Sequence, residues 1–184
     1  MSELKYEAPK SVDAAVALLA AGDDSARIFA GGTDLLVQMR EEMIAPTLLV
    51  DIKNITETRS VTIGADDIRI GAAVTGAELG EHAELKALWP GVVEAVELIG
   101  SAQVQGRATV GGNLCNASPA ADSVPALTAA NARVSIAGPD GVRDVPVEEF
   151  SSGPGQTVLA AGEFVVSLVL PRPAAGSGDA YLRF

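Results

Sequence analysis

Two pairs of adjacent glycines, each beside short polar residues, are the features of this sequence that suggest chemistry. The first pair occurs in Ala30-Gly31-Gly32-Thr33-Asp34, and the second occurs in Thr109-Val110-Gly111-Gly112-Asn113. Glycine permits a positive φ angle, and because it has no Cβ it lets another group approach the backbone closely. Main-chain N–H groups presented by such turns bind phosphate. We interpret the two segments as parts of one flavin-nucleotide site.

The charge of the chain limits what this site can bind and how. The formal net charge is −11, from 13 Lys and Arg against 24 Asp and Glu. Such a charge argues against nucleic acid and against an anionic membrane surface as partners. A diphosphate would therefore be held by main-chain N–H groups and hydroxyls, with little help from basic side chains.

The chain has few residues that could bind a metal ion. Cys115 is the single cysteine and His82 the single histidine, so we predict no internal disulfide, no iron–sulfur cluster and no metal site. We expect Cys115 to be a small buried residue. The chain contains no basic N-terminal region followed by an apolar run, and no uncharged apolar stretch of about 18 residues. These features predict a cytoplasmic protein without membrane insertion.

The first third of the chain reads as helix, strand, glycine turn and helix. Ser11 is typical of a helix N-cap and Gly22 of a helix end, so we predict a helix over 12–21. A strand over 27–30 then leads into the first glycine pair, and a helix over 35–40 follows. Further strands are predicted at 48–51, 61–63 and 68–70, the last two as a hairpin.

The remainder alternates helices with strands. We predict a short helix from 75, a helical stretch over 85–99 broken at 90–91, and a helix over 122–132. The second glycine pair is placed in a loop over 100–116. Strands are predicted at 133–137 and 142–147, as a second hairpin, and at 163–170 and 181–184, with a loop at 151–155.

These elements predict an α+β fold with two lobes. Residues 1–56 would form an N-terminal α/β lobe that carries the first glycine turn. Residues 57–184 would form a larger α+β lobe that carries the second. A ligand contacted by both turns would lie in the cleft between the lobes.

The side chains around the glycines suit a ligand with phosphates and hydroxyls. Asp34 would repel a phosphate, so we expect its carboxylate to cap the helix or to accept from a ribose or ribitol hydroxyl. Thr109, Asn113 and Asn116 offer neutral donors, and Asp122 could accept from sugar hydroxyls. The alternatives are that the first turn only permits a bend and that the second is a polar loop satisfying its own backbone.

Both motifs, their order and their separation resemble the FAD-binding medium subunit of the molybdenum hydroxylases, which include xanthine dehydrogenase and carbon monoxide dehydrogenase. The resemblance covers nearly the whole chain. It implies a fold similar to that of vanillyl-alcohol-oxidase-type flavoproteins, with mixed sheets and flanking helices. Members usually continue into a C-terminal domain, which is absent from this sequence.

The resemblance also implies roles for individual residues. Gly31, Gly32 and Thr33 would donate to phosphate, and Asp34 would contact the cofactor. Asp122 would bind sugar hydroxyls, and Val165 or Val166 would pack near the flavin ring. The complete set of implied FAD contacts is Ile28, Phe29, Ala30, Gly31, Gly32, Thr33, Asp34, Leu35, Thr109, Gly111, Gly112, Asn113, Asn116, Asp122, Val165 and Val166. No acid–base catalytic residue is predicted.

The function that follows from the resemblance is electron transfer. The chain would be the FAD-binding oxidoreductase subunit of a molybdenum hydroxylase, with an iron–sulfur subunit and a molybdopterin subunit as partners. Electrons would pass from the iron–sulfur clusters to FAD and on to NAD⁺, a quinone or oxygen. The alternatives are a free-standing flavin oxidase or reductase, and a non-catalytic nucleotide-binding module.

Overall fold

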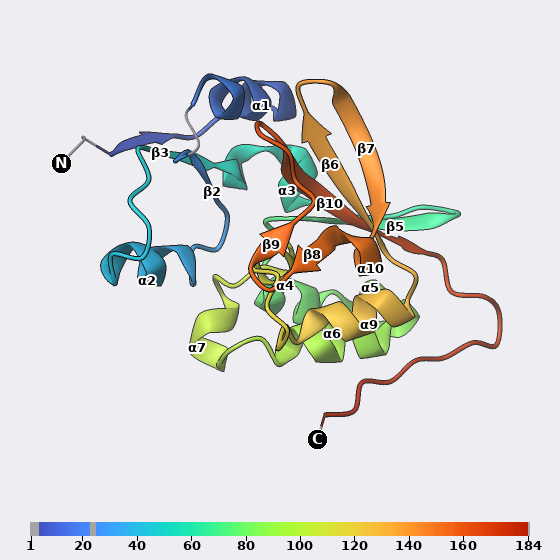
Figure 1. Ribbon diagram of the computed structural model, residues 1–184. Helices are drawn as coiled ribbons and strands as arrows, with labels where there is room; N and C mark the ends of the chain where they lie inside the picture. Colours follow the sequence, from blue (N-terminus) through green and yellow to red (C-terminus); the bar gives the residue numbers. More distant parts are fainter. Residues whose placement is uncertain (1–3, 23–24, 184) are drawn as a thin grey trace.

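The computed structural model describes residues 4–22 and 25–183, in which the strands form three sheets (Figure 1). The first sheet lies near the N-terminus and has parallel strands in the order β1 (Lys5–Glu7), β3 (Leu48–Asp51), β2 (Arg27–Phe29). Two helices belong to this part of the chain, α1 (Val12–Ala21) and α2 (Leu35–Arg40). Because α2 directly follows the first glycine pair, the turn connects this sheet to a helix.

The second sheet has five antiparallel strands. Their order is β4 (Val61–Ile63), β5 (Asp67–Gly71), β10 (Phe164–Pro171), β6 (Arg133–Gly138), β7 (Gly141–Pro146). A separate small hairpin consists of β8 (Ser151–Gly153) and β9 (Gln156–Thr157). The central strand β10 is buried along its whole length up to the exposed Pro171, so this strand organises the core.

Short helices cover the larger sheet, and in Figure 1 α4, α5, α6 and α9 lie together below it. The helices of this part are η1 (Ile52–Asn54), α3 (Thr56–Arg59), α4 (Gly76–Glu81), α5 (Ala83–Leu88), α6 (Pro90–Glu97), α7 (Ala102–Gln105), α8 (Val110–Cys115), α9 (Ser123–Ala129) and α10 (Val147–Phe150). None of the helices in the described residues is long and apolar enough to cross a membrane.

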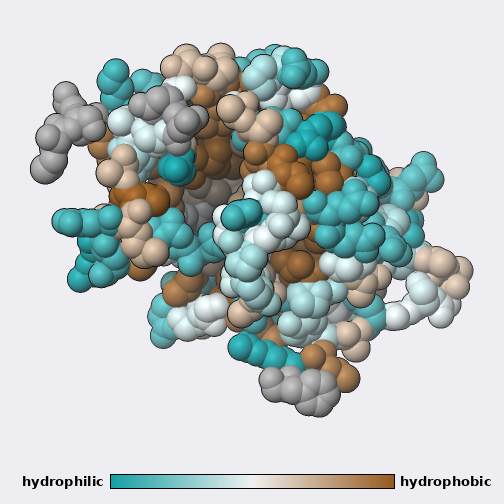
Figure 2. All heavy atoms as spheres, in the orientation of Figure 1, coloured by the Kyte–Doolittle hydropathy of each residue, from teal (hydrophilic) through white to brown (hydrophobic). Residues whose placement is uncertain are grey.

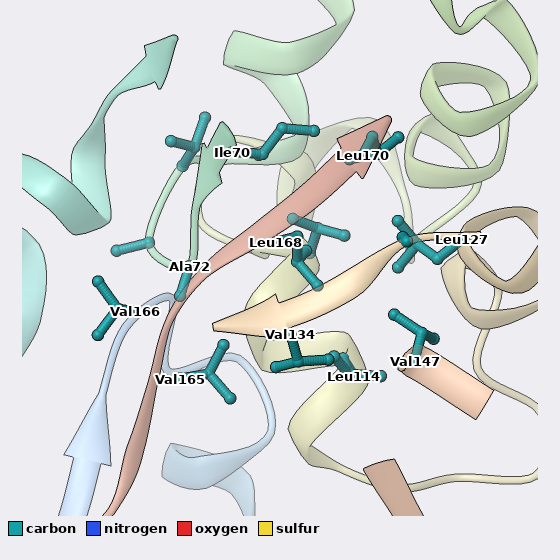
Figure 3. Close-up of a cluster of buried hydrophobic side chains, with 14 of the residues drawn as sticks. Ile70, Ala72, Leu114, Leu127, Val134, Val147, Val165, Val166, Leu168 and Leu170 are labelled. Carbon is teal, nitrogen blue, oxygen red and sulfur yellow. The ribbon is translucent and has the colours of Figure 1, made fainter. Parts of the chain in front are cut away.

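The hydrophobic core forms around β10 (Figure 3). Leu168 and Leu170 pack with Ile70 of β5, Val134 of β6 and Leu127 of α9, and all five are fully buried. Burying one such side chain contributes about 1.5–3 kcal/mol. The register of β10 shifts between Val165 and Ser167, where β10 pairs with β6.

Most of the predicted elements are confirmed. The helix over 12–21 has the predicted caps: Ser11 Oγ accepts from the Ala14 N–H at 3.3 Å, and the Gly22 N–H donates to the Leu18 carbonyl at 2.9 Å. The helix over 35–40, the strand over 48–51 and the two predicted hairpins are present within a residue or two. The predicted α+β class is therefore correct.

Three predicted elements are wrong. The second glycine pair lies in helix α8 rather than in a loop, because Thr109 Oγ1 accepts from the Gly112 N–H at 3.0 Å and begins a helix there. The expected loop over 151–155 contains β8, which pairs with β9. Residues 181–183 are not a strand, and Phe184 lies outside the described residues.

The domain boundary predicted at 56/57 falls at the first residues of α3. This helix follows the last strand of the three-stranded sheet and precedes the first strand of the five-stranded sheet. We keep a division into residues 1–56 and 57–184 as a proposal.

Candidate functional site

The first glycine turn is held between two other parts of the chain. A Cβ on Gly31 would lie 2.1 Å from the carbonyl oxygen of Arg107, so the turn packs directly on the backbone that leads into α8. Gly32 has a φ of +76°, and a Cβ there would lie 2.3 Å from Cε2 of the Phe29 ring. Both positions therefore require glycine, one for close approach and one for its conformation.

The second glycine pair divides in a similar way. A Cβ on Gly111 would lie 2.6 Å from the carbonyl oxygen and 2.8 Å from the Cα of Ala72. At Gly112, an added Cβ would lie 2.9 Å from the Thr109 hydroxyl oxygen, and outside its chain neighbours and its own helix backbone it would meet no other described residue within 4 Å. Gly111 thus packs α8 against the backbone after β5, whereas Gly112 leaves the helix surface open.

Both glycine pairs border one cavity of about 910 Å³. This volume is at the upper end of the range for ligand pockets. Figure 2 shows a hollow with hydrophobic walls in this region. The sequence-predicted residues in its lining are Ile28, Ala30, Gly31, Gly32, Thr33, Asp34, Leu35, Thr109, Gly111, Gly112, Asn113, Asn116 and Val165. The structure therefore brings the two motifs together.

Three predicted residues lie outside this lining. Phe29 lies under the glycine turn, where its ring packs against Gly32. Asp122 forms an ion pair with Arg183 at 3.3 Å. Val166 is buried at the register shift of β10, and in Figure 3 it lies on the side of the strand opposite Val165.

The first turn presents main-chain donors. The N–H groups of Gly31, Gly32, Thr33 and Leu35 make no hydrogen bond to any residue that the structure describes. All four residues line the cavity. Since a main-chain N–H without a protein acceptor binds water or a ligand, the turn can hold an anion.

The side chains of Asn113 and Asp34, which lie near these donors, differ in their hydrogen bonds. Asn113 Oδ1 accepts from the N–H and the Oγ of Ser123, at 3.3 Å and 2.6 Å, which leaves the amide NH₂ as a donor. Asp34 stands at the N-cap position of α2, but its side chain caps no N–H. The expectation that Asp34 caps this helix is therefore wrong.

The cavity has walls that the motifs did not reveal. They include Leu19 and Ala20 of α1, Arg27 of β2, Gln38 of α2, and residues 159–164 before and at the start of β10. Arg27 is a basic residue of the lining and follows no motif. The only feature of the sequence that could have indicated the segment 159–164 as part of the cavity wall was its position beside the predicted strand at 163–170.

Cys115 also lines the cavity, and it is exposed there. The expectation of a small buried residue is wrong, because α8 turns this side chain toward the cavity instead of the core.

Two carboxylates near the cavity, those of Asp51 and Glu163, have lowered pKa values in the folded protein. Burial would raise the pKa of Asp51, but hydrogen bonds from Lys53 and Tyr6 outweigh it and lower that pKa. Arg143 binds both carboxylate oxygens of Glu163, at 2.8 and 2.7 Å, and lowers its pKa. Both groups thus bind protons more weakly in the folded state than in the unfolded state.

We expect the protein to lose stability in acid for this reason. A lowered folded-state pKa gives stability above the unfolded-state value, and this stability disappears as the pH falls through the folded-state value. The midpoint of urea unfolding should be level at neutral pH and fall below about pH 4.5. The double variant Asp51→Asn, Glu163→Gln should show a weaker fall; an equal fall would contradict the assignment.

A comparison with known families shows which family the chain belongs to. The family described as an FAD binding domain in molybdopterin dehydrogenase matches residues 2–173. The chain belongs to this family. The predicted family is thereby confirmed.

Curated relatives of this FAD-binding domain family are similar over most of the chain. The carbon monoxide dehydrogenase medium chain of Hydrogenophaga pseudoflava is 36% identical over 177 residues, covering 96% of this chain and 62% of that protein. The xanthine dehydrogenase FAD-binding subunit of Escherichia coli O157:H7 is 34% identical over 168 residues, covering 90% and 58%. The chain spans about three fifths of the length of these relatives.

Solved structures show the same fold. A carbon monoxide dehydrogenase from Hydrogenophaga pseudoflava has a TM-score of 0.90 at 35% identity, covering 95% of this chain and 61% of that chain. The quinoline 2-oxidoreductase from Pseudomonas putida 86 has a TM-score of 0.88 at 31% identity, covering 93% and 60%. The predicted two-lobed α+β fold of an FAD-binding domain is confirmed by this likeness.

Proposed function

We propose that the chain is the FAD-binding part of an electron-transfer subunit in a molybdenum-hydroxylase-type oxidoreductase. The observation that carries this proposal is the single cavity bordered by both glycine motifs, with unbonded main-chain N–H groups along the first turn. The chain's membership of the FAD-binding domain family supports it. The donor set also fits FAD, because neutral donors can hold a diphosphate in a chain with a net charge of −11.

In this proposal, the residues of the chain bind and orient the cofactor. Gly31, Gly32 and Thr33 donate main-chain N–H groups to the diphosphate, and Asn113 donates its amide NH₂. Gly112 lets a phosphate approach α8 closely. Val165 contributes an apolar wall for the flavin ring. FAD, when bound, supplies the exchange between one-electron and two-electron transfer.

The remaining contacts complete the binding site. We propose that the carboxylates of Asp34 and Asp122 accept from hydroxyl groups of FAD. Asn116 would donate a further hydrogen bond. Phe29 and Val166 would support the turn and the strand from behind. The other proposed cofactor residues are Ile28, Ala30, Leu35, Thr109 and Gly111.

The proposed partners rest on the family of the chain, which is described as an FAD binding domain in molybdopterin dehydrogenase. The relatives described above belong to carbon monoxide and xanthine dehydrogenases. We propose an iron–sulfur subunit and a molybdopterin subunit as partners in the cytoplasm. The electron acceptor would be NAD⁺, a quinone or oxygen.

Reconstitution tests the proposed cofactor. The purified chain is incubated with FAD, FMN or riboflavin and passed through a desalting column. We expect only FAD to be retained in stoichiometric amount, with a flavin absorption spectrum, because FAD alone carries the diphosphate and adenosine. A colourless protein after incubation with FAD would contradict the proposal. The proposed partners are tested by coexpressing the chain with the iron–sulfur and molybdopterin subunits. We expect iron to copurify with the chain.

Asn113→Asp is expected to weaken FAD binding without unfolding the protein. The new carboxylate still accepts from Ser123, but it places a negative charge where the amide donor stood. We expect the Kd for FAD to rise by roughly tenfold or more, and less at high salt. Fluorescence titration measures the Kd. Asn131→Asp adds the same charge at an exposed position outside the cavity lining and should leave the Kd unchanged.

A further inference from the structure

Lys53 lies directly behind the first glycine turn. Its Nζ donates to the carbonyl oxygen of Ala30 at 3.0 Å and lies 4.0 Å from the centroid of the Phe29 ring. It also pairs with Asp51 Oδ2 at 2.8 Å. One ammonium group thus contacts two consecutive residues that lead into the turn and a carboxylate at the end of β3.

Asp51 fixes the position of this ammonium group. Its side chain is only 5% exposed, and its Oδ1 accepts from the Lys53 main-chain N–H at 2.9 Å. Tyr6 donates its hydroxyl to Oδ2 of the same carboxylate. Because Asp51 is held at both oxygens, the lysine side chain is held in one arrangement despite its flexible stem.

The contacts of Lys53 continue into the groups that face the cavity. The Phe29 ring under the ammonium also packs against Gly32. The Ala30 carbonyl and the Gly31 N–H belong to the same peptide unit, and that N–H has no acceptor among the described residues. A cation that binds the carbonyl polarises the peptide and strengthens its N–H as a donor.

We propose that Lys53 is a positioning residue for the diphosphate of FAD: it holds residues 29–32 in place and polarises the Ala30–Gly31 peptide without touching the cofactor. This inference rests on the proposed function. Lys53 is absent from the cavity lining, so its effect passes through the turn. None of the sequence motifs pointed to it.

The test separates positioning from simple charge neutralisation. Lys53→Met removes the cation and leaves Asp51 as a buried, unpaired charge. The double variant Lys53→Met, Asp51→Asn removes that charge as well and should restore the melting temperature. Lys86→Met is the matched control, because Lys86 pairs with Glu97 at 3.1 Å outside the cavity lining. Kd values are measured for FAD and, by competition, for ADP.

We expect the Kd for FAD to rise by about tenfold or more in Lys53→Met and to stay high in the double variant. The Kd for ADP should rise by the same factor, since ADP retains the diphosphate. Lys53→Arg, which keeps a cation, should recover part of the loss. The control should stay within about twofold of the wild type.

Other outcomes overturn the inference. If the double variant binds FAD as tightly as the wild type, Lys53 only neutralises Asp51. If the Kd for FAD rises but that for ADP does not, the effect lies away from the diphosphate. Failure of the wild type itself to bind FAD would instead overturn the proposed function. Since Asp51→Asn removes the unpaired charge, the double variant gives a result even where Lys53→Met does not fold.

Discussion

Gly111→Ala is expected to destabilise the protein by about 3 kcal/mol, whereas Gly112→Ala should leave the stability nearly unchanged and reduce FAD binding. At Gly111 the new methyl group would lie 2.6 Å from the Ala72 carbonyl oxygen, which is main chain and cannot rotate away. At Gly112 it would meet only the Thr109 hydroxyl oxygen, at 2.9 Å. Losing that helix cap costs about 1 kcal/mol, and the better helix propensity of alanine offsets it.

Urea unfolding and FAD titration on the two variants measure these effects. We expect the Kd of Gly112→Ala to rise by roughly tenfold or more, because the methyl group covers helix surface that borders the cavity. Equal loss of stability in both variants would show that Gly111 and Gly112 are required only for packing of the fold. Tight FAD binding by Gly112→Ala would remove α8 from the proposed phosphate site.

Gly32→Ala is expected to have the second large effect. An alanine at a φ of +76° is strained by about 1 kcal/mol, and its methyl group would overlap the Phe29 ring. The ring and the turn would have to move apart, which displaces the N–H groups that we assign to the diphosphate. We expect the Kd for FAD to rise by roughly tenfold or more, together with a fall in stability of roughly 2 kcal/mol.

Gly176→Ala separates backbone strain from loss of the site. Gly176 has a φ of +80°, but nothing lies within 4 Å of the Cβ that alanine would add. The variant should carry only the strain of about 1 kcal/mol and bind FAD like the wild type. Calorimetry and the same titration provide the comparison. Equal FAD affinity in the Gly32 and Gly176 variants would refute the role of the first turn.

The sequence was sufficient for elements with strong local signals. Ser11 and Gly22 cap the two ends of α1 as predicted. The hairpins of the larger sheet follow from short turns between apolar runs. The second glycine pair was misread because glycine disfavours a helix interior by about 1 kcal/mol. In the structure, the Thr109 cap and the close packing of Gly111 on Ala72 outweigh this preference.

The site was predictable in part for a physical reason. The motifs indicated which segments carry donors, and the structure places both beside one cavity. They could not indicate that Gly31 rests on the Arg107 carbonyl, because this contact joins residues far apart in the sequence. Lys53 and Arg27 were missed because neither stands in a glycine motif. Their positions depend on how β2 and β3 pair.

The contact between Gly31 and the Arg107 carbonyl places the first glycine pair beside the segment that leads into α8, so one ligand can contact both. Under the proposed function, FAD bound by both segments would join the small N-terminal sheet to the rest of the molecule. Bound FAD would then stabilise the folded state by an amount that grows with the logarithm of the free FAD concentration over Kd. Protein variants with a weakened N-terminal sheet would then be partly stabilised by added FAD and would unfold more readily when FAD is scarce.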